Sequence, residues 1–239
     1  MPSRAACDDA PAVRLLALDT STEACSAALY LDGQVRVRFE MAPREHSRVL
    51  LPMLDSLLAE AQLHVGALDG LAYGRGPGAF TGVRIAAGTV QGIGLGCDLP
   101  VVAVSSLAAL AQGVRREFAS ERVMSAIDAR MGEVYWATYR LGPDGLMELI
   151  GDEQVVAPGA VPIPSGDHWH GAGSGWGAYG DALRGRLAGL VGDIHPRRYP
   201  SAEDVAVLGA AGLQRGRAVS AERALPVYLR DRVASKPGG

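Results

Sequence analysis

Three short segments of the sequence combine acidic, hydroxyl and glycine residues in ways that could hold a phosphate group. The first is Asp19-Thr20-Ser21-Thr22, which follows an apolar run. A carboxylate and several hydroxyls at such a turn could face the metal and phosphates of a nucleotide. The same residues are common in hairpin turns, where they bond to their own backbone, and local chemistry alone favours that simpler interpretation. Both interpretations stay open on this segment.

The second segment is the glycine-rich run Gly74–Arg84, GRGPGAFTGVR, which leads into a predicted helix. The N-terminus of a helix attracts anions, and Arg75 and Arg84 could add positive charge. The spacing matches neither a dinucleotide fingerprint nor a P-loop, and a tight strand-to-helix turn with close packing is the alternative. The predicted phosphate contacts of the two segments are Asp19, Thr20, Gly76 and Gly78.

The third segment contains Asp128, followed by Ala129 and Arg130. In active ATPases with two similar lobes, small and flexible residues follow the aspartate at this turn. Ala129 and Arg130 take those places here, so a second phosphate-binding loop is doubtful. A further glycine-rich stretch, Gly171–Trp176, could be an adenine-side loop or a plain flexible loop, and the sequence favours neither.

Tests for a metal site and for a nucleophile both fail. No two histidines lie four residues apart, and His168 and His170, which would share a face in a strand, lack a nearby third ligand. Cys25 and Cys97 have no adjacent histidine or basic cluster, and GxSxG does not occur. The remaining histidines and cysteine are His46, His64, His195 and Cys7. We therefore predict neither a metal site nor covalent catalysis.

The composition limits the classes of partner. The chain has 239 residues and a formal net charge of −3, so it is a poor stand-alone binder of nucleic acid. No apolar run reaches the length of a membrane span, and the polar segment Met1–Pro11 does not resemble a signal peptide. These features predict a cytoplasmic protein without a membrane partner.

The pattern of apolar residues predicts an α/β fold that opens with three strands, at Val13–Leu18, Cys25–Leu31 and Gln34–Glu40. Alternating helices and strands follow, at Ser47–Ala61, Leu68–Tyr73, Thr81–Gly96, Pro100–Val104 and Ser105–Phe118. The second half offers strands at Val123–Ile127, Glu133–Tyr139 and Glu148–Val156, and helices at Ala178–Leu190 and Ala202–Arg215. This order is typical of the actin/Hsp70/sugar-kinase (ASKHA) class, in which each of two lobes has a mixed sheet flanked by helices. We predict a first lobe at 1–118 and a smaller, degenerate lobe at 119–239, with the last roughly 20 residues packing back on the first.

Several sequence runs closely resemble the bacterial TsaB (YeaZ) family, from about Leu15 to Ala234. They are LLALDTSTEACSAALY, PREHSRVLLPMLDSLL, LAYGRGPGAFTGVRIAAGTVQGIGLG, AIDARMGEVYWATY and LPVYLRDRVA. The resemblance implies a non-catalytic subunit in the synthesis of tRNA N6-threonylcarbamoyladenosine (t6A). Such a subunit binds and activates the transferase TsaD, helps to recruit the ATPase TsaE and contacts tRNA only indirectly. It requires no cofactor, although ATP or ADP could bind weakly or at a subunit junction.

The catalytic relative TsaD carries a metal-binding His-x-x-x-His where this chain has Ser106 and Leu110. Serine is a poor replacement ligand and leucine cannot bind a metal, so the resemblance predicts that the chain is not an enzyme. The alternative is a weak ATPase or small-molecule kinase of the ASKHA class that uses Asp19 and Asp128. The altered residues after Asp128 argue against it.

In the family, TsaB and TsaD pair through helices of their N-terminal lobes, which match Ser47–Ala61 and Phe80–Gly96 here. Without TsaD the same surface could form a homodimer. If Leu54 or Val90 faces the partner, its replacement by Arg should weaken assembly and leave the fold intact; the alternative is that both helices only cover their own sheet. The predicted interface residues are Leu50, Met53, Leu54, Leu57, Phe80, Val83, Ala87, Val90 and Gly94.

Overall fold

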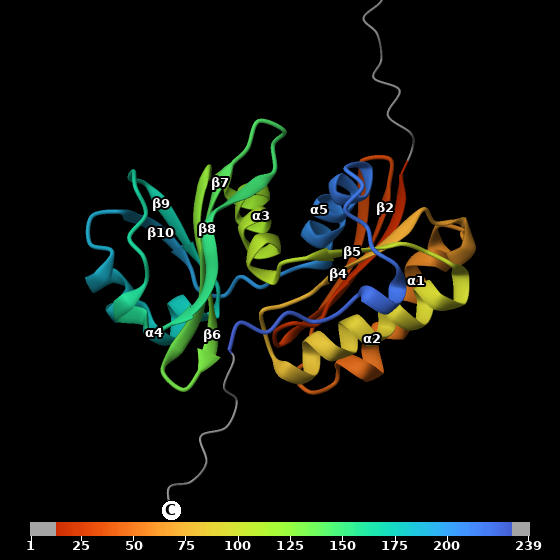
Figure 1. Cartoon of the computed structure of the whole chain (residues 1–239), viewed down its shortest axis with the longest axis horizontal. Coiled ribbons are helices and arrows are strands. Elements are labelled where there is room, and N and C mark those ends of the chain that lie inside the picture. The colour runs from red at the N-terminus through yellow and green to blue at the C-terminus, as the bar shows by residue number, and fades with distance from the viewer. Residues whose placement is uncertain (1–12, 231–239) are drawn as a thin grey trace, which may run out of the picture.

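The computed structural model describes residues 13–230, so the expectations for Cys7 and Met1–Pro11 lie outside the described residues. Two five-stranded mixed sheets, each with helices on both faces, form two lobes side by side (Figure 1). The predicted ASKHA-like α/β fold with two lobes is confirmed. None of the helices between Val13 and Arg230 is long and apolar enough to cross a membrane.

The first sheet has the strand order β3-β2-β1-β4-β5. Strands β1 to β3 form the predicted antiparallel meander, and β1, β4 and β5 are parallel. Their bounds are β1 Arg14–Asp19, β2 Ala24–Leu31, β3 Gln34–Met41, β4 Gly70–Gly74 and β5 Val101–Val104.

Side chains alternate along β1 and so supply two cores. Leu16 and Leu18 pack with helices α1 (His46–Glu60) and α2 (Phe80–Cys97) on one face. Leu15 and Ala17 pack with helix α5 (Ala202–Gln214) on the other. Because both faces are covered, this central strand is apolar along nearly its whole length.

The second sheet has the strand order β10-β9-β6-β7-β8. Helix α3 (Ser106–Phe118) covers one face and helix α4 (Ser174–Arg186) the other. The strands are β6 Arg122–Arg130, β7 Glu133–Leu141, β8 Met147–Val156, β9 Trp169–Ala172 and β10 Val191–His195, and short 3₁₀ helices lie at η1 Val65–Ala67, η2 Pro158–Ala160 and η3 Ala221–Arg223.

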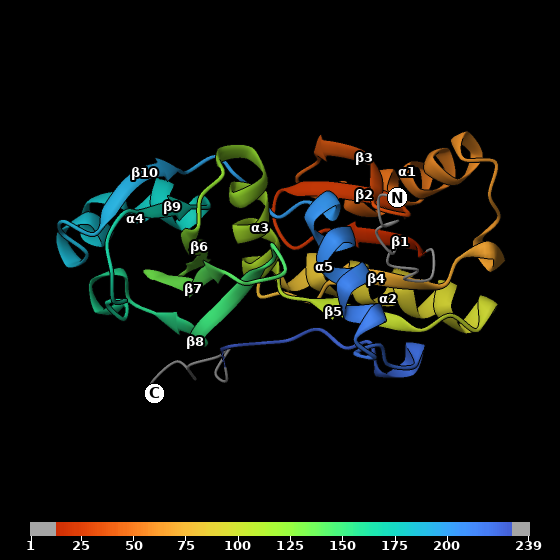
Figure 2. The same ribbon diagram turned by 90° about the horizontal axis from the view of Figure 1, so that it is seen from above.

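The packing of α3 and α5 differs from the predicted lobe boundaries at 118 and 119. Helix α3 was expected in the first lobe, yet Leu107, Leu110 and Val114 pack in the core of the second sheet. Helix α5 was expected in the second lobe, yet it covers the first sheet (Figure 2). The chain therefore enters the second lobe at α3 and returns to the first at α5, because each sheet needs an apolar helix on its second face.

Sequence patterns missed two short strands and misplaced one helix. Strands β9 and β10 were not predicted, since sequences such as WHGA carry no alternation long enough to detect. Helix α4 begins at Ser174 and ends at Arg186, whereas Ala178–Leu190 was expected. The stretch Gly171–Trp176 is accordingly the end of a strand, a turn at Gly173 with φ of 103° and the start of α4.

Candidate functional site

The first predicted phosphate turn is buried and bonded to itself. Asp19 ends β1 and has no exposed surface, and its Oδ1 accepts hydrogen bonds from the Ser21 amide (2.9 Å) and hydroxyl (2.8 Å). Thr20 is equally buried and its hydroxyl donates to the carbonyl of Gly82 (2.7 Å). Neither side chain faces solvent, so the prediction that Asp19 and Thr20 contact a phosphate is wrong.

The glycine-rich turn packs directly on the first turn. A Cβ on Gly78 would lie 2.2 Å from the Ser21 carbonyl oxygen, and one on Gly82 would lie 1.9 Å from that of Thr20. The Ala79 amide also donates to the Ser21 carbonyl (2.7 Å). Gly76 is likewise buried. These glycines therefore allow close packing of the two backbones.

Arg75 joins the two lobes instead of binding a phosphate. Its Nη2 lies 3.0 Å from Oε2 of Glu153 on β8, and the Tyr139 hydroxyl donates to Oε1 of the same carboxylate (3.0 Å). Glu153 is nearly buried, so this ion pair is shielded from solvent and fixes the lobes relative to one another.

Burial raises the pKa of Asp19 to about 6, against an ordinary value of 3.8. The Ser21 hydrogen bonds, the nearby His46 and Ser106 act in the opposite direction and only partly offset burial. Within residues 13–230, neither Oδ2 of Asp19 nor the Ser106 hydroxyl has a hydrogen-bond partner of normal geometry. The carboxylate is thus a buried charge with one oxygen left unsatisfied.

The second-lobe turn is also occupied by its own side chains. Asp128 accepts hydrogen bonds from the Arg130 amide (2.8 Å) and guanidinium (2.9 Å) and from the Tyr179 hydroxyl (3.3 Å). Arg130 reaches across to Glu23 of the first lobe at 3.4 Å. A cavity of about 390 Å³ lies between the two turns, lined among others by Phe80 and Arg130. Asp128 is thus paired to Arg130, one of the two residues that make a phosphate-binding loop doubtful in the sequence.

The two positions that the resemblance matched to metal ligands, Ser106 and Leu110, lie on α3. Leu110 is buried in the core of the second sheet, and Ser106 is buried near Asp19. The structure does bring His170 and His195 together, with Nδ1 and Nε2 3.1 Å apart, which sequence spacing did not reveal. Within the described range, no group of three His, Cys, Asp or Glu side chains gathers as a metal site would require.

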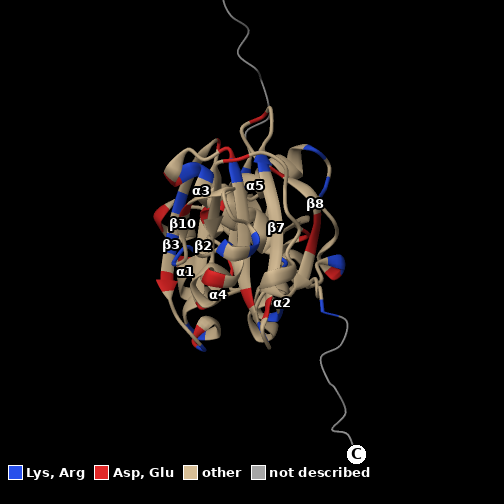
Figure 3. Ribbon diagram, turned by 90° about the vertical axis from the view of Figure 1, so that its left-hand side faces the viewer, with Lys and Arg blue, Asp and Glu red and all other residues tan. Residues whose placement is uncertain are grey.

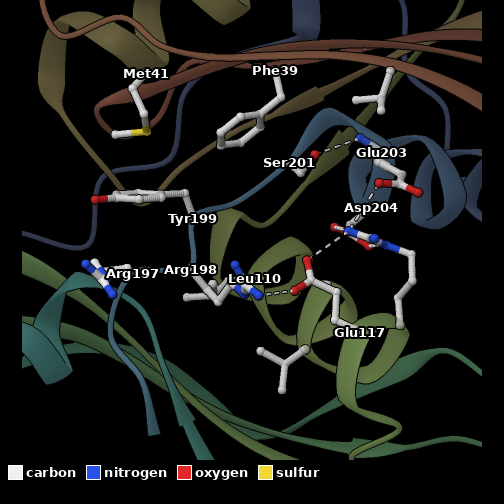
Figure 4. Close-up of a pocket in the computed structure, with 14 residues that line it drawn as sticks. Phe39, Met41, Leu110, Glu117, Arg197, Arg198, Tyr199, Ser201, Glu203 and Asp204 are labelled. Atoms are coloured by element: carbon white, nitrogen blue, oxygen red, sulfur yellow. Dashed lines mark hydrogen bonds and ion pairs between the residues drawn. The ribbon is translucent and has the colours of Figure 1, made fainter.

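A second hollow, of about 420 Å³, lies between β3, α3 and the segment that leads to α5 (Figure 4). Phe39, Met41 and Tyr199 form its apolar side. On its polar side Arg116 donates two hydrogen bonds to the buried Asp204, at 3.0 and 3.1 Å. Burial raises the pKa of Asp204 to about 6 even though Arg116 opposes the shift. This ion pair ties α3 to α5 and so helps to hold the lobes together.

Most of the predicted interface side chains face the chain's own core. Phe80 is exposed and Met53 partly so, but the others are packed under α1 and α2. This choice of residues is wrong because the apolar stripe of each helix is the face that covers the sheet. Replacing Leu54 or Val90 with Arg would bury an unpaired charge and disrupt the fold, so neither variant can report on assembly. The buried members are Leu50, Leu54, Leu57, Val83, Ala87, Val90 and Gly94.

The outer faces of α1 and α2 form a shallow apolar groove of about 430 Å³. Leu51, which is 54% exposed, lines it from α1. Gly88 and Gly92 line it from α2, and among the described residues no atom lies within 4 Å of where their Cβ atoms would be. Leu95, 58% exposed, lies beyond Gly92 on the same helix. The groove is open, apolar and accessible to the backbone of another helix.

Charges on the outer face of the second lobe are mixed in sign. Figure 3 shows Arg interspersed with Asp and Glu, with no continuous basic stripe among the described residues on this face. Nucleic-acid surfaces need clustered positive charge, so this view gives no support for direct RNA binding by the second lobe.

The protein is ASKHA-like: it has two lobes, each with a five-stranded mixed sheet, and a cavity between them. The turns of the first lobe are buried. The family model for TsaD, tRNA N6-adenosine threonylcarbamoyltransferase, matches residues 37–168. The tRNA threonylcarbamoyladenosine biosynthesis protein TsaB of Escherichia coli K12 is 44% identical over 228 residues, 94% of this chain and 97% of the relative. That of Haemophilus influenzae is 40% identical over 93% of this chain and 95% of the relative. The solved structure of YeaZ from Pseudomonas aeruginosa is 49% identical with a TM-score of 0.84, and the match covers 91% of this chain and all of that one. The chain belongs to the TsaB family, and the resemblance noted in the sequence is confirmed.

Proposed function

We propose that this protein is a non-catalytic subunit of the t6A synthesis complex, which binds the transferase TsaD through the groove between α1 and α2 and holds it in an active form. The open groove with Leu51 on one side and Gly88 and Gly92 on the other is the observation that carries the proposal. Membership of a family whose curated relatives are named for threonylcarbamoyladenosine biosynthesis supports the pathway.

The glycines of the groove favour a helix as the contacting element. Gly88, Gly92 and Gly96 recur every four residues along α2, and all three are exposed. Such a stripe lets a second helix approach closely, and the flanking apolar side chains fill the seam. Exposed apolar surface of this kind usually marks a contact with another protein. In the absence of TsaD, a second copy of this chain is the expected occupant.

We propose a non-catalytic protein because of the turns at Asp19 and Asp128 and because of helix α3. Asp19 and Thr20 are buried, Asp128 is paired with Arg130, and Leu110 stands where TsaD carries a metal ligand. These arrangements leave a nucleotide without contacts from Asp19 or Thr20, which disfavours the weak ATPase or kinase alternative. We further propose that TsaE joins the complex through the assembled subunits and that tRNA is contacted only indirectly.

The sharpest test is a Gly92→Arg variant mixed with purified TsaD. Wild type should form a heterodimer at micromolar concentration in size-exclusion chromatography. The arginine side chain would fill the groove and meet apolar partner surface, so we expect affinity measured by calorimetry to fall at least about 100-fold.

Gly185→Arg is the matched control, because Gly185 is also an exposed helical glycine with open space around its Cβ position among the described residues, but it lies on α4 of the second lobe. It should bind TsaD like wild type. If the wild-type protein forms no heterodimer, the proposal is wrong. If both variants lose TsaD affinity equally, the groove is not the surface that binds TsaD.

A further inference from the structure

Arg84 contacts two neighbouring aromatic rings at the edge of the groove. Its guanidinium carbon lies 3.3 Å from the ring centroid of Phe80 and 4.8 Å from that of Tyr228. The two ring centroids are 5.9 Å apart. Phe80 is 56% and Tyr228 45% exposed, so the arrangement lies at the surface. An exposed arginine is normally mobile, whereas this one lies over the Phe80 ring and is flanked by the Tyr228 ring.

The second ring is supplied by the segment 224–230, which runs from η3 along the first lobe to the second lobe (Figure 2). The Ala224 carbonyl accepts from the Gln91 side chain (3.1 Å), and the Leu225 carbonyl accepts from the Tyr73 hydroxyl (2.9 Å). The Val227 amide donates to the Arg75 carbonyl (2.8 Å). These bonds hold the backbone that leads up to Tyr228, so its ring is placed before any partner binds.

Among the described residues, only part of the hydrogen-bonding capacity of the Arg84 guanidinium is used. One Nη donates to the Phe80 carbonyl (3.1 Å). Arg75 and Arg230 each pair with a carboxylate, but among residues 13–230 no Asp or Glu lies within ion-pair distance of Arg84. A planar guanidinium with free N–H groups binds a carboxylate through two parallel hydrogen bonds.

Arg84 also lines the groove between α1 and α2. A partner seated on Gly88 and Gly92 therefore comes within reach of it. Tyr and Arg dominate the residues that carry most binding energy at interfaces, and a pre-positioned arginine loses little entropy when it binds. We propose that Arg84, held against the rings of Phe80 and Tyr228, anchors an Asp or Glu side chain of the protein that docks on α1 and α2. This inference rests on the proposed function, which supplies TsaD as that protein.

The test compares Arg84→Gln with wild type in calorimetric titrations against TsaD at two salt concentrations. We expect Arg84→Gln to bind about 10- to 100-fold more weakly and to show a shallower salt dependence, because a charge-assisted contact is lost. Tyr228→Ala should weaken binding by a smaller factor. The double variant should bind like Arg84→Gln alone, since the ring acts through the guanidinium.

Arg115→Gln is the control, because Arg115 is a partly exposed helical arginine that likewise donates to its own backbone, at Ala119, but it lies on α3. It should bind TsaD normally. If Arg84→Gln binds within twofold of wild type while Gly92→Arg fails to bind, this inference falls and the proposed function stands. If wild type itself does not bind TsaD, both fall. A loss of tRNA affinity with TsaD affinity intact would assign Arg84 to a phosphate and overturn the inference.

Discussion

The Gly82→Ala variant is expected to lose its native fold at temperatures where wild type is fully folded. The added Cβ would lie 1.9 Å from the carbonyl oxygen of Thr20, which is backbone and cannot rotate away. The Gly82 carbonyl also accepts the Thr20 hydroxyl, so moving α2 outward breaks a buried hydrogen bond. We expect a loss of more than about 4 kcal/mol in the free energy of unfolding, measured by urea denaturation followed by circular dichroism.

Gly96→Ala provides the matched control in the same helix. No described atom lies within 4 Å of its Cβ position, so the methyl group meets no obstacle. Alanine is favoured over glycine inside a helix by about 0.5–1 kcal/mol, and Gly96→Ala should be slightly more stable than wild type. If Gly82→Ala lowers the free energy of unfolding while Gly96→Ala raises it, the direct contact of Gly82 with the Thr20 backbone is confirmed. A mild effect at Gly82 would show instead that the turns separate easily.

The second large effect concerns the charge on Asp19. Because its pKa is raised in the folded protein to about 6 from 3.8, the folded state binds the proton more tightly than the unfolded state. Stability should therefore rise as the pH falls from above 6 towards 3.8, and the buried charge costs on the order of 3 kcal/mol at neutral pH. Asp204 titrates in the same range with the same sign, so the two effects add.

Asp19→Asn should remove the Asp19 share of this dependence. An amide oxygen can still accept from Ser21, and the amide group carries no buried charge. We expect the free energy of unfolding of the variant to be about 1–3 kcal/mol higher than that of wild type at pH 7.5. Its free energy of unfolding should also depend less on pH between about pH 4 and 6, measured by denaturant titration at several pH values. Asp55→Asn, on an exposed position of α1, should change neither. A variant less stable than wild type at every pH would show that the charge itself stabilises the turn.

Local sequence patterns predicted most elements of the fold and the family, but not which face of each helix is exposed. The strand alternation of β3 and the spacing of Leu50, Leu54 and Leu57 in α1 indicate secondary structure directly, because they follow the period of each element. Helix α2 is different. Small and apolar residues occur on both of its faces, so the buried Val90 and the exposed Gly92 look equivalent in the sequence.

The candidate site was the least predictable part for a related reason. Glycine-rich turns suit both anion binding and close backbone packing, and only the position of Thr20 against Gly82 distinguishes the two. Contacts such as those of Arg84 with Tyr228 join residues far apart in the chain, so no local pattern can show them. The exposed groove could have been suspected from the recurrence of Gly88, Gly92 and Gly96, which is unusual for a helix that only covers its own sheet.

The return of α5 to the first sheet has a consequence for how the protein is made. On the ribosome, strands β1 to β5 emerge early, but the face of their sheet that carries Leu15 and Ala17 stays uncovered until Val205 and Ala206 have been synthesised. The first lobe therefore cannot complete its core during most of translation, and the second lobe is finished before it. Contacts this distant in sequence also make folding slow. A chain released before Ala202 would expose that apolar face, so premature termination should give aggregation instead of a functional half.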